Sequence, residues 1–138
     1  MSQRILAVLG ALLAALGVLL GAFHAHGLEK WLVESGLEPD QVARAMHNAD
    51  VAIRYQLTHA VALLAISAWL ARMPGRSLLT GSWMLVVGLA LFSGGLYLIV
   101  VTGTAIHWAI VPSGGLIMII GWLLIAVGLA IHCGREDG

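Results

Sequence analysis

Four stretches of about 20 mostly apolar residues limit this chain to a narrow set of folds. A helix needs about 20 apolar residues to cross about 30 Å of hydrocarbon. The chain reaches that length at residues 5–23, 52–71, 83–101 and 110–131. No stretch alternates polar and apolar residues as the strands of a membrane β-barrel must. We therefore predict an all-α membrane protein in which residues 1–138 form one domain with four transmembrane helices.

The composition supports a membrane protein and excludes several other classes. Hydrophobic residues make up 60% of the 138 residues and charged residues 10%, whereas a soluble domain has roughly a quarter charged residues. Seven basic and seven acidic side chains give a net charge of zero, so we expect the lipid bilayer as a partner and no nucleic acid, which requires a basic face. The single Cys133 cannot form an internal disulfide. The first apolar run is too long for a signal-peptide core, and we expect it to be retained.

The first connection, residues 24–51, differs from the others because it is long and carries most of the acidic residues. Pro39 suits the first turn of a helix. Apolar residues then recur at spacings of three and four, which is typical of an amphipathic helix. They are Val42, Ala45, Met46, Ala49 and Ile53. We predict an amphipathic helix over 39–51 that lies along the membrane surface before it bends or runs into the second span.

The basic residues predict an orientation, because Lys and Arg near span ends favour the cytoplasmic side. With four spans, both termini share one side of the membrane with the second connection. That side holds Arg4, Arg72, Arg76 and Arg135. The other side holds Lys30, Arg44 and Arg54, diluted by five acidic residues. We expect both termini in the cytoplasm and, in a bacterium, a protein of the inner membrane.

Glycines predict how the spans pack, since helices associate in lipid through close packing of small residues. In three spans the glycines recur every seven residues, a spacing that keeps them on nearly one helix face. We predict a glycine-rich four-helix bundle with these contact residues: Gly10, Gly17, Gly21, Gly88, Gly95, Gly114, Gly121 and Gly128. The same faces suit a second copy of the chain, so the pattern leaves the oligomeric state open.

Polar side chains gather toward the predicted external end of the spans. His59 lies seven residues into the second span, about 10 Å deep at 1.5 Å per residue. Polar residues inside hydrocarbon usually face the bundle interior, so we expect several of them to converge between helices. The candidate ligand-binding residues are His26, Arg54, Gln56, His59, Ser93 and Tyr97. In the structural alternative, Arg54 pairs with Asp50 or reaches headgroups, and His59 hydrogen-bonds across helices.

Other function classes have weaker support. His26 and His59 are weak candidates for a metal or haem ligand, because no pair of histidines has a spacing such as H-x-x-x-H. No acidic residue lies in any span, which counts against the proton relay of a small multidrug exporter. Neither a nucleophile–base pair nor a phosphate-binding loop is present. We therefore predict no catalytic residue, no enzyme and no cofactor.

Four motifs resemble a known family. The run Gly21–Gly27, GAFHAHG, resembles a GAFGAHG signature, and Arg54–Ala60, RYQLTHA, matches RYQxxHA. Leu91–Leu98, LFSGGLYL, is similar to LFSGSLYL. Thr102-Gly103, Pro112–Gly115 and Gly121-Trp122 resemble a TG…TPxGG…GW ending. Together these motifs resemble the YgdD/YwdK-like family of small membrane proteins, the domain of unknown function 423 (UPF0382 type).

The resemblance implies an inner-membrane protein with four spans and no particular reaction. It marks the same six candidate residues as positions to test, while His24 replaces a glycine of the family pattern. Our first hypothesis is a non-enzymatic accessory, assembly or stabilising component of the membrane, with other membrane proteins or a second copy as partners. The alternative is binding or transport of a small polar, lipid or quinone-like ligand at the polar cluster. The second alternative is metal or haem binding through the histidines.

Overall fold

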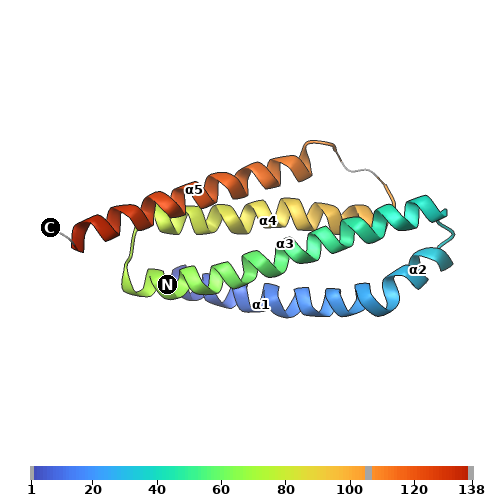
Figure 1. The fold of residues 1–138 in the computed structure, drawn as a ribbon, viewed down its shortest axis with the longest axis horizontal. Helices are drawn as coiled ribbons and strands as arrows, with labels where there is room; N and C mark the ends of the chain where they lie inside the picture. Colours follow the sequence, from blue (N-terminus) through green and yellow to red (C-terminus); the bar gives the residue numbers. More distant parts are fainter. Residues whose placement is uncertain (1, 105–106, 137–138) are drawn as a thin grey trace.

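The computed structural model describes residues 2–104 and 107–136, and in these residues every regular element is a helix (Figure 1). The elements are α1 (Ser2–Phe23), the π-helical turn η1 (His24–Leu28), α2 (Glu29–Glu34), α3 (Pro39–Arg72), α4 (Arg76–Thr102) and α5 (Ile110–Glu136). Four helices are long and apolar enough to cross a membrane, which confirms the predicted fold class. The side chains of Cys133 and Arg135 lie outside the described residues.

The first two spanning helices are longer than their apolar runs. The first continues through η1 and α2 as one stretch of 33 residues, and α3 has 34 residues. At 1.5 Å per residue each measures about 50 Å, more than the roughly 30 Å of hydrocarbon. The predicted amphipathic helix 39–51 is therefore the first part of α3, continuous with the second span. Only residues 35–38 lie between α2 and α3.

Residues at the end of α2 and the start of α3 explain why the connection between these helices is short. Gly36 adopts a left-handed φ of 80°, a conformation that suits glycine just after a helix end. Pro39 stands at the start of α3, and Glu38 and Gln41 form a capping box around the first turn. No proline or glycine follows until Pro74 and Gly75, so nothing separates the amphipathic segment from the span.

The α2–α3 hairpin extends beyond the other helices at one end of the molecule (Figure 1). It packs with η1 and α4 around a small core made of Leu28, Leu32, Val42, Ala45, Ala49 and Val100. His24 Nε2 lies 3.2 Å from the carbonyl oxygen of Met46. Because a carbonyl only accepts, the ring donates this bond. The histidine that departs from the family pattern thus ties η1 to α3.

Glycines bring the backbones of α4 and α5 into direct contact. A Cβ placed on Gly88 would lie 2.6 Å from Met118 Cγ and 2.8 Å from the Gly114 carbonyl oxygen. On Gly114 it would lie 2.5 Å from the Phe92 nitrogen, and on Gly121 2.9 Å from the Gly81 oxygen. These distances are shorter than any side chain permits, so both helices need glycine at these positions.

The other predicted packing glycines differ in how tightly they are held. A Cβ on Gly10 would lie 3.0 Å from the Ala60 oxygen, and one on Gly17 would lie 2.7 Å from Leu57 Cδ2, both on α3. A Cβ on Gly128 would lie 3.0 Å from the Leu78 nitrogen, whereas one on Gly21 would make an ordinary contact of 3.7 Å. Gly95 is buried on α4. Close approach therefore occurs between α1 and α3 as well as between α4 and α5.

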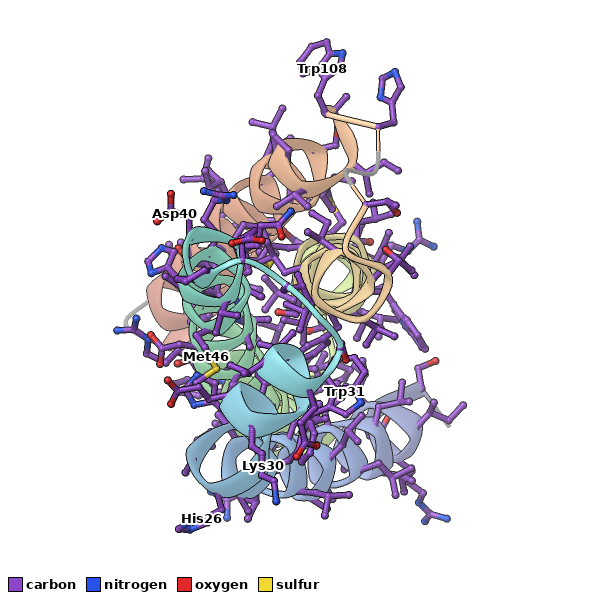
Figure 2. The ribbon with its side chains drawn as sticks, turned by 90° about the vertical axis from the view of Figure 1, so that its right-hand side faces the viewer. His26, Lys30, Trp31, Asp40, Met46 and Trp108 are labelled. Carbon is purple, nitrogen blue, oxygen red and sulfur yellow. The ribbon has the colours of Figure 1, made fainter. Side chains whose placement is uncertain are left out.

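The helices follow one another in space as α1, α3, α4 and α5, with α1 and α5 on opposite sides (Figure 2). In the described residues, the backbone of α5 packs against α4. Neither α1 nor α3 is a direct backbone neighbour of α5. The central core lies along α3 and α4 and includes Leu63, Leu78, Leu85 and Leu89. The bundle is therefore an open array, and the outer faces of α1 and α5 are apolar and exposed.

We predict that Gly88→Leu destabilises the protein whereas Gly94→Leu on the same helix does not. A side chain at Gly88 meets α5 backbone, while a Cβ at Gly94 has no atom within 4 Å. Overpacking costs about 1–3 kcal/mol, which lowers the melting temperature in detergent. Equal melting temperatures for Gly88→Leu and the unmodified protein would show that α4 and α5 do not meet at this point.

Candidate functional site

Gln56 and Tyr97 form a buried polar link among three helices. The Tyr97 hydroxyl donates to Gln56 Oε1 at 2.8 Å. Gln56 Nε2 in turn donates to the Leu13 carbonyl oxygen at 2.8 Å. Only 2% of Gln56 is exposed, so its amide is removed from both water and lipid. One amide side chain on α3 thereby joins α4 to α1.

Ser93 makes a second contact between α3 and α4. Its hydroxyl donates to the Ala52 carbonyl oxygen at 3.0 Å, and the residue is buried. Gln56, Ser93, Gly94 and Tyr97 also border a crevice of about 230 Å³ between α1 and α4, whose other walls are leucine, valine and alanine side chains. The structure thus brings together three of the predicted site residues beside a small apolar crevice.

His59 lies in a separate cluster that faces α5. Its Nδ1 is 2.8 Å from the Tyr55 carbonyl oxygen, which can only accept, so Nδ1 carries the hydrogen. The Trp122 indole donates to the remaining nitrogen, Nε2, at 3.2 Å. Tyr55 stacks on His59 with a centroid distance of 5.9 Å and contacts Phe92 at 4.5 Å. The geometry therefore defines a neutral imidazole with both nitrogens paired.

Arg54 does not join either cluster, contrary to its expected convergence with His59, Ser93 and Tyr97, and the candidate His26 also lies apart from both clusters. Arg54 forms an exposed ion pair with Asp50 one turn earlier on α3, the structural alternative considered above. His26 is exposed on η1 (Figure 2). Both side chains are exposed, Arg54 on α3 and His26 on η1, so neither points into the bundle interior.

His26 and His59 lie too far apart to hold one metal ion. His24, two residues from His26, contacts Met46. Met46 precedes His59 by 13 residues on α3, or roughly 20 Å along the helix. Metal–nitrogen bonds measure about 2 Å. In the described residues, no group of three or more histidine, cysteine or acidic side chains has the arrangement of a metal site.

Sequence reasoning missed Trp122 as a partner of His59 and missed the backbone acceptors of Leu13, Ala52 and Met46. Trp122 belongs to one of the family-like motifs, but nothing in the sequence pairs it with a residue 63 positions away. The sequence does not reveal which backbone carbonyl groups accept hydrogen bonds, because every residue has a carbonyl group. Each buried polar side-chain atom in the described residues has a hydrogen-bond partner. Most of the bonds described above run between different helices, so the chemistry available to this arrangement is to join helices.

Four apolar helices joined by buried polar links define an α-helical integral membrane protein. The sequence model of the family "Protein of unknown function (DUF423)" matches residues 20–115. With this match and the full-length relatives that follow, the chain belongs to the DUF423 family.

Curated relatives cover nearly the whole chain. The UPF0382 membrane protein YwdK of Bacillus subtilis (strain 168) is 38% identical over 91% of this chain and 95% of its own length. The UPF0382 inner membrane protein YgdD of Escherichia coli (strain K12) is 30% identical over 99% of this chain and 96% of its own length. A UPF0382 membrane protein of Haemophilus influenzae is 35% identical over 80% of this chain and 82% of its own length. No solved structure matches the chain.

We predict that Gln56 and Tyr97 are energetically coupled. Gln56→Leu, Tyr97→Phe and the double variant form a cycle whose unfolding free energies isolate the hydrogen bond. Such bonds in membrane proteins contribute about 0.6 kcal/mol and at most about 1.7 kcal/mol. Gln56→Leu combined with Trp122→Phe is the control, because these residues share no partner. Additive effects in both cycles would contradict the link between α3 and α4.

Proposed function

We propose that this protein is a non-enzymatic accessory component of the membrane that assists the assembly or stability of other membrane proteins. The observation that carries the proposal is the use of the buried polar groups. Gln56, His59, Ser93 and Tyr97 all bond to the protein's own helices. Their donors and acceptors are therefore engaged in holding the array together, and the accessible surface of the spans is apolar.

The open array supports a role in contacting other helices. In the most apolar window of the α1 span only 17% of the residues are buried, and for α5 the figure is 28%. These helices occupy the two edges of the array, so a partner helix would pack on either edge without separating existing contacts. Helix association in lipid depends on packing of this kind.

The ligand and metal alternatives have less support from the same geometry. The crevice beside Gln56 offers about 230 Å³, below the roughly 300–1,000 Å³ of typical ligand pockets. Its polar groups already have partners within the protein. Coordination of a metal or haem by His59 Nε2 would first require loss of the hydrogen bond from Trp122. Ligand binding and metal or haem binding would therefore both require existing hydrogen bonds to rearrange, whereas the accessory role requires no such change.

We expect photocrosslinkers on the outer faces to capture membrane proteins in living cells. Leu12 on α1 and Leu123 on α5 suit this test because each is 62% exposed. Leu85, which is fully buried, is the control position. A partner captured repeatedly from Leu12 or Leu123 but not from Leu85, and identified by mass spectrometry, supports the proposal. Recovery of the protein alone, together with saturable binding of a small solute, contradicts it.

We further propose that both termini face the cytoplasm. The N-terminal end of the array carries Arg4, Arg72 and Arg76, whereas the hairpin end carries five acidic residues as well as its basic ones. This asymmetry supports a cytoplasmic arginine end. Green fluorescent protein at the C-terminus should therefore fluoresce, and alkaline phosphatase there should be inactive. Insertion of the same reporters after Gly36 should give the opposite pattern, and a reversed result at both sites contradicts the orientation.

A further inference from the structure

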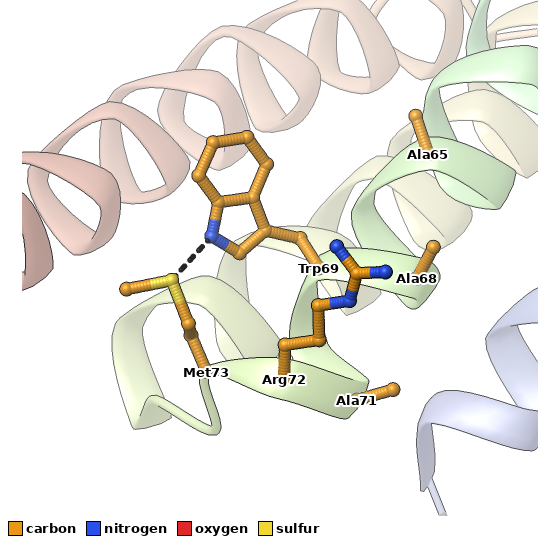
Figure 3. Close-up of a pocket in the computed structure, with 6 residues that line it drawn as sticks. All are labelled: Ala65, Ala68, Trp69, Ala71, Arg72 and Met73. Atoms are coloured by element: carbon orange, nitrogen blue, oxygen red, sulfur yellow. Dashed lines mark hydrogen bonds between the residues drawn. The ribbon is translucent and has the colours of Figure 1, made fainter.

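A cleft of about 600 Å³ lies on the outer face of α3 near its C-terminal end (Figure 3). Its lining residues are Ala65, Ala68, Trp69, Ala71, Arg72 and Met73. The Trp69 indole donates to Met73 Sδ at 2.9 Å, which holds the ring as one wall. The cleft therefore combines a small apolar floor, an aromatic wall and one cationic side chain.

Three arginines lie at this end of the molecule, and none of them forms an ion pair among the described side chains. Arg72 ends α3, Arg76 begins α4 after a short turn, and Arg4 lies in the first turn of α1. The start of α1 and the α3–α4 turn line a common recess, so the three arginines belong to one end. The acidic residues from Glu29 to Asp50 lie at the opposite end, and the one described acidic residue at the arginine end is Glu136, the last residue of α5.

The cleft also runs from the helix end into the membrane-spanning part of α3, as a binding site for a lipid would. Ala65 precedes Arg72 by seven residues, which places it about 10 Å deeper along the helix. The floor thus runs from the cationic helix end into the apolar span. Tryptophan is enriched where the hydrocarbon meets the headgroups, and Trp69 lies between the two parts. No described side chain of α1 or α5 lines the cleft.

We propose that this cleft binds an anionic phospholipid. The Arg72 guanidinium receives the phosphate, since its planar donors match phosphate oxygens. The first part of one acyl chain lies over Ala65 and Ala68, and the Trp69 indole packs beside the glycerol region. Arg4 and Arg76 add to the positive field that favours a net negative headgroup over a zwitterionic one. The accessory role proposed above is independent of this site.

The test compares binding of defined lipids to the purified, delipidated full chain. The probes are phosphatidylglycerol, phosphatidylcholine with the same acyl chains, and inorganic phosphate, with native mass spectrometry as the readout. Arg72→Gln removes the cation, and Ala68→Leu fills the floor while the charge stays. Arg54→Gln is the matched control, because Arg54 is an exposed arginine of the same helix that pairs with Asp50. Melting temperatures confirm that each variant is folded.

We expect phosphatidylglycerol to bind more tightly than phosphatidylcholine. Arg72→Gln should weaken phosphatidylglycerol about fivefold, the change that corresponds to about 1 kcal/mol per basic residue near an anionic surface. Ala68→Leu should weaken both lipids, and Arg54→Gln should leave binding unchanged. Equal binding to the Arg72→Gln and unmodified proteins would overturn the proposal. Competition by inorganic phosphate that Ala68→Leu does not alter would overturn it too, because a free anion would then be the ligand.

Discussion

The close contact between the backbones of α4 and α5 is the interaction on which the rest of the structure depends. Lipid provides no hydrophobic driving force for helix association, so short packing distances must supply it. Glycines at 81, 88, 114 and 121 allow those distances. Because α5 packs against one face of α4, α3 packs against another face of α4. The helix α1 in turn packs against α3. The order of helices across the array follows from this pairing.

Buried polar side chains complement the glycine contacts by adding hydrogen bonds between helices. His59 and Trp122 join α3 to α5, which are not backbone neighbours. Gln56 connects α3 to both α1 and α4. In hydrocarbon an unpaired polar group costs several kcal/mol, so each link restricts the helices to the arrangement that satisfies it. The two groups of polar side chains consequently form an internal framework of the array.

The two ends of the array have different chemistry. At one end the α2–α3 hairpin extends beyond the other helices and carries five acidic residues, two of them in ion pairs with Lys30 and Arg54. At the other end Arg72 borders a cleft on the face of α3 between α1 and α5. The proposed accessory role and the proposed lipid site would consequently use different surfaces, since the first needs the apolar edges and the second a cationic helix end.

The sequence by itself determined the number of spans and the class of fold, because apolar length and glycine spacing are local properties. It also predicted a helix starting at Pro39 and left open whether this helix bends before the second span or runs into it. Only the tertiary structure decided that Gln56 and Tyr97 form one cluster and His59 another, and that Arg54 stays outside both. The physical reason is that contacts between residues far apart in the chain set the rotation of each helix about its own axis. This rotation decides which partner each polar side chain meets.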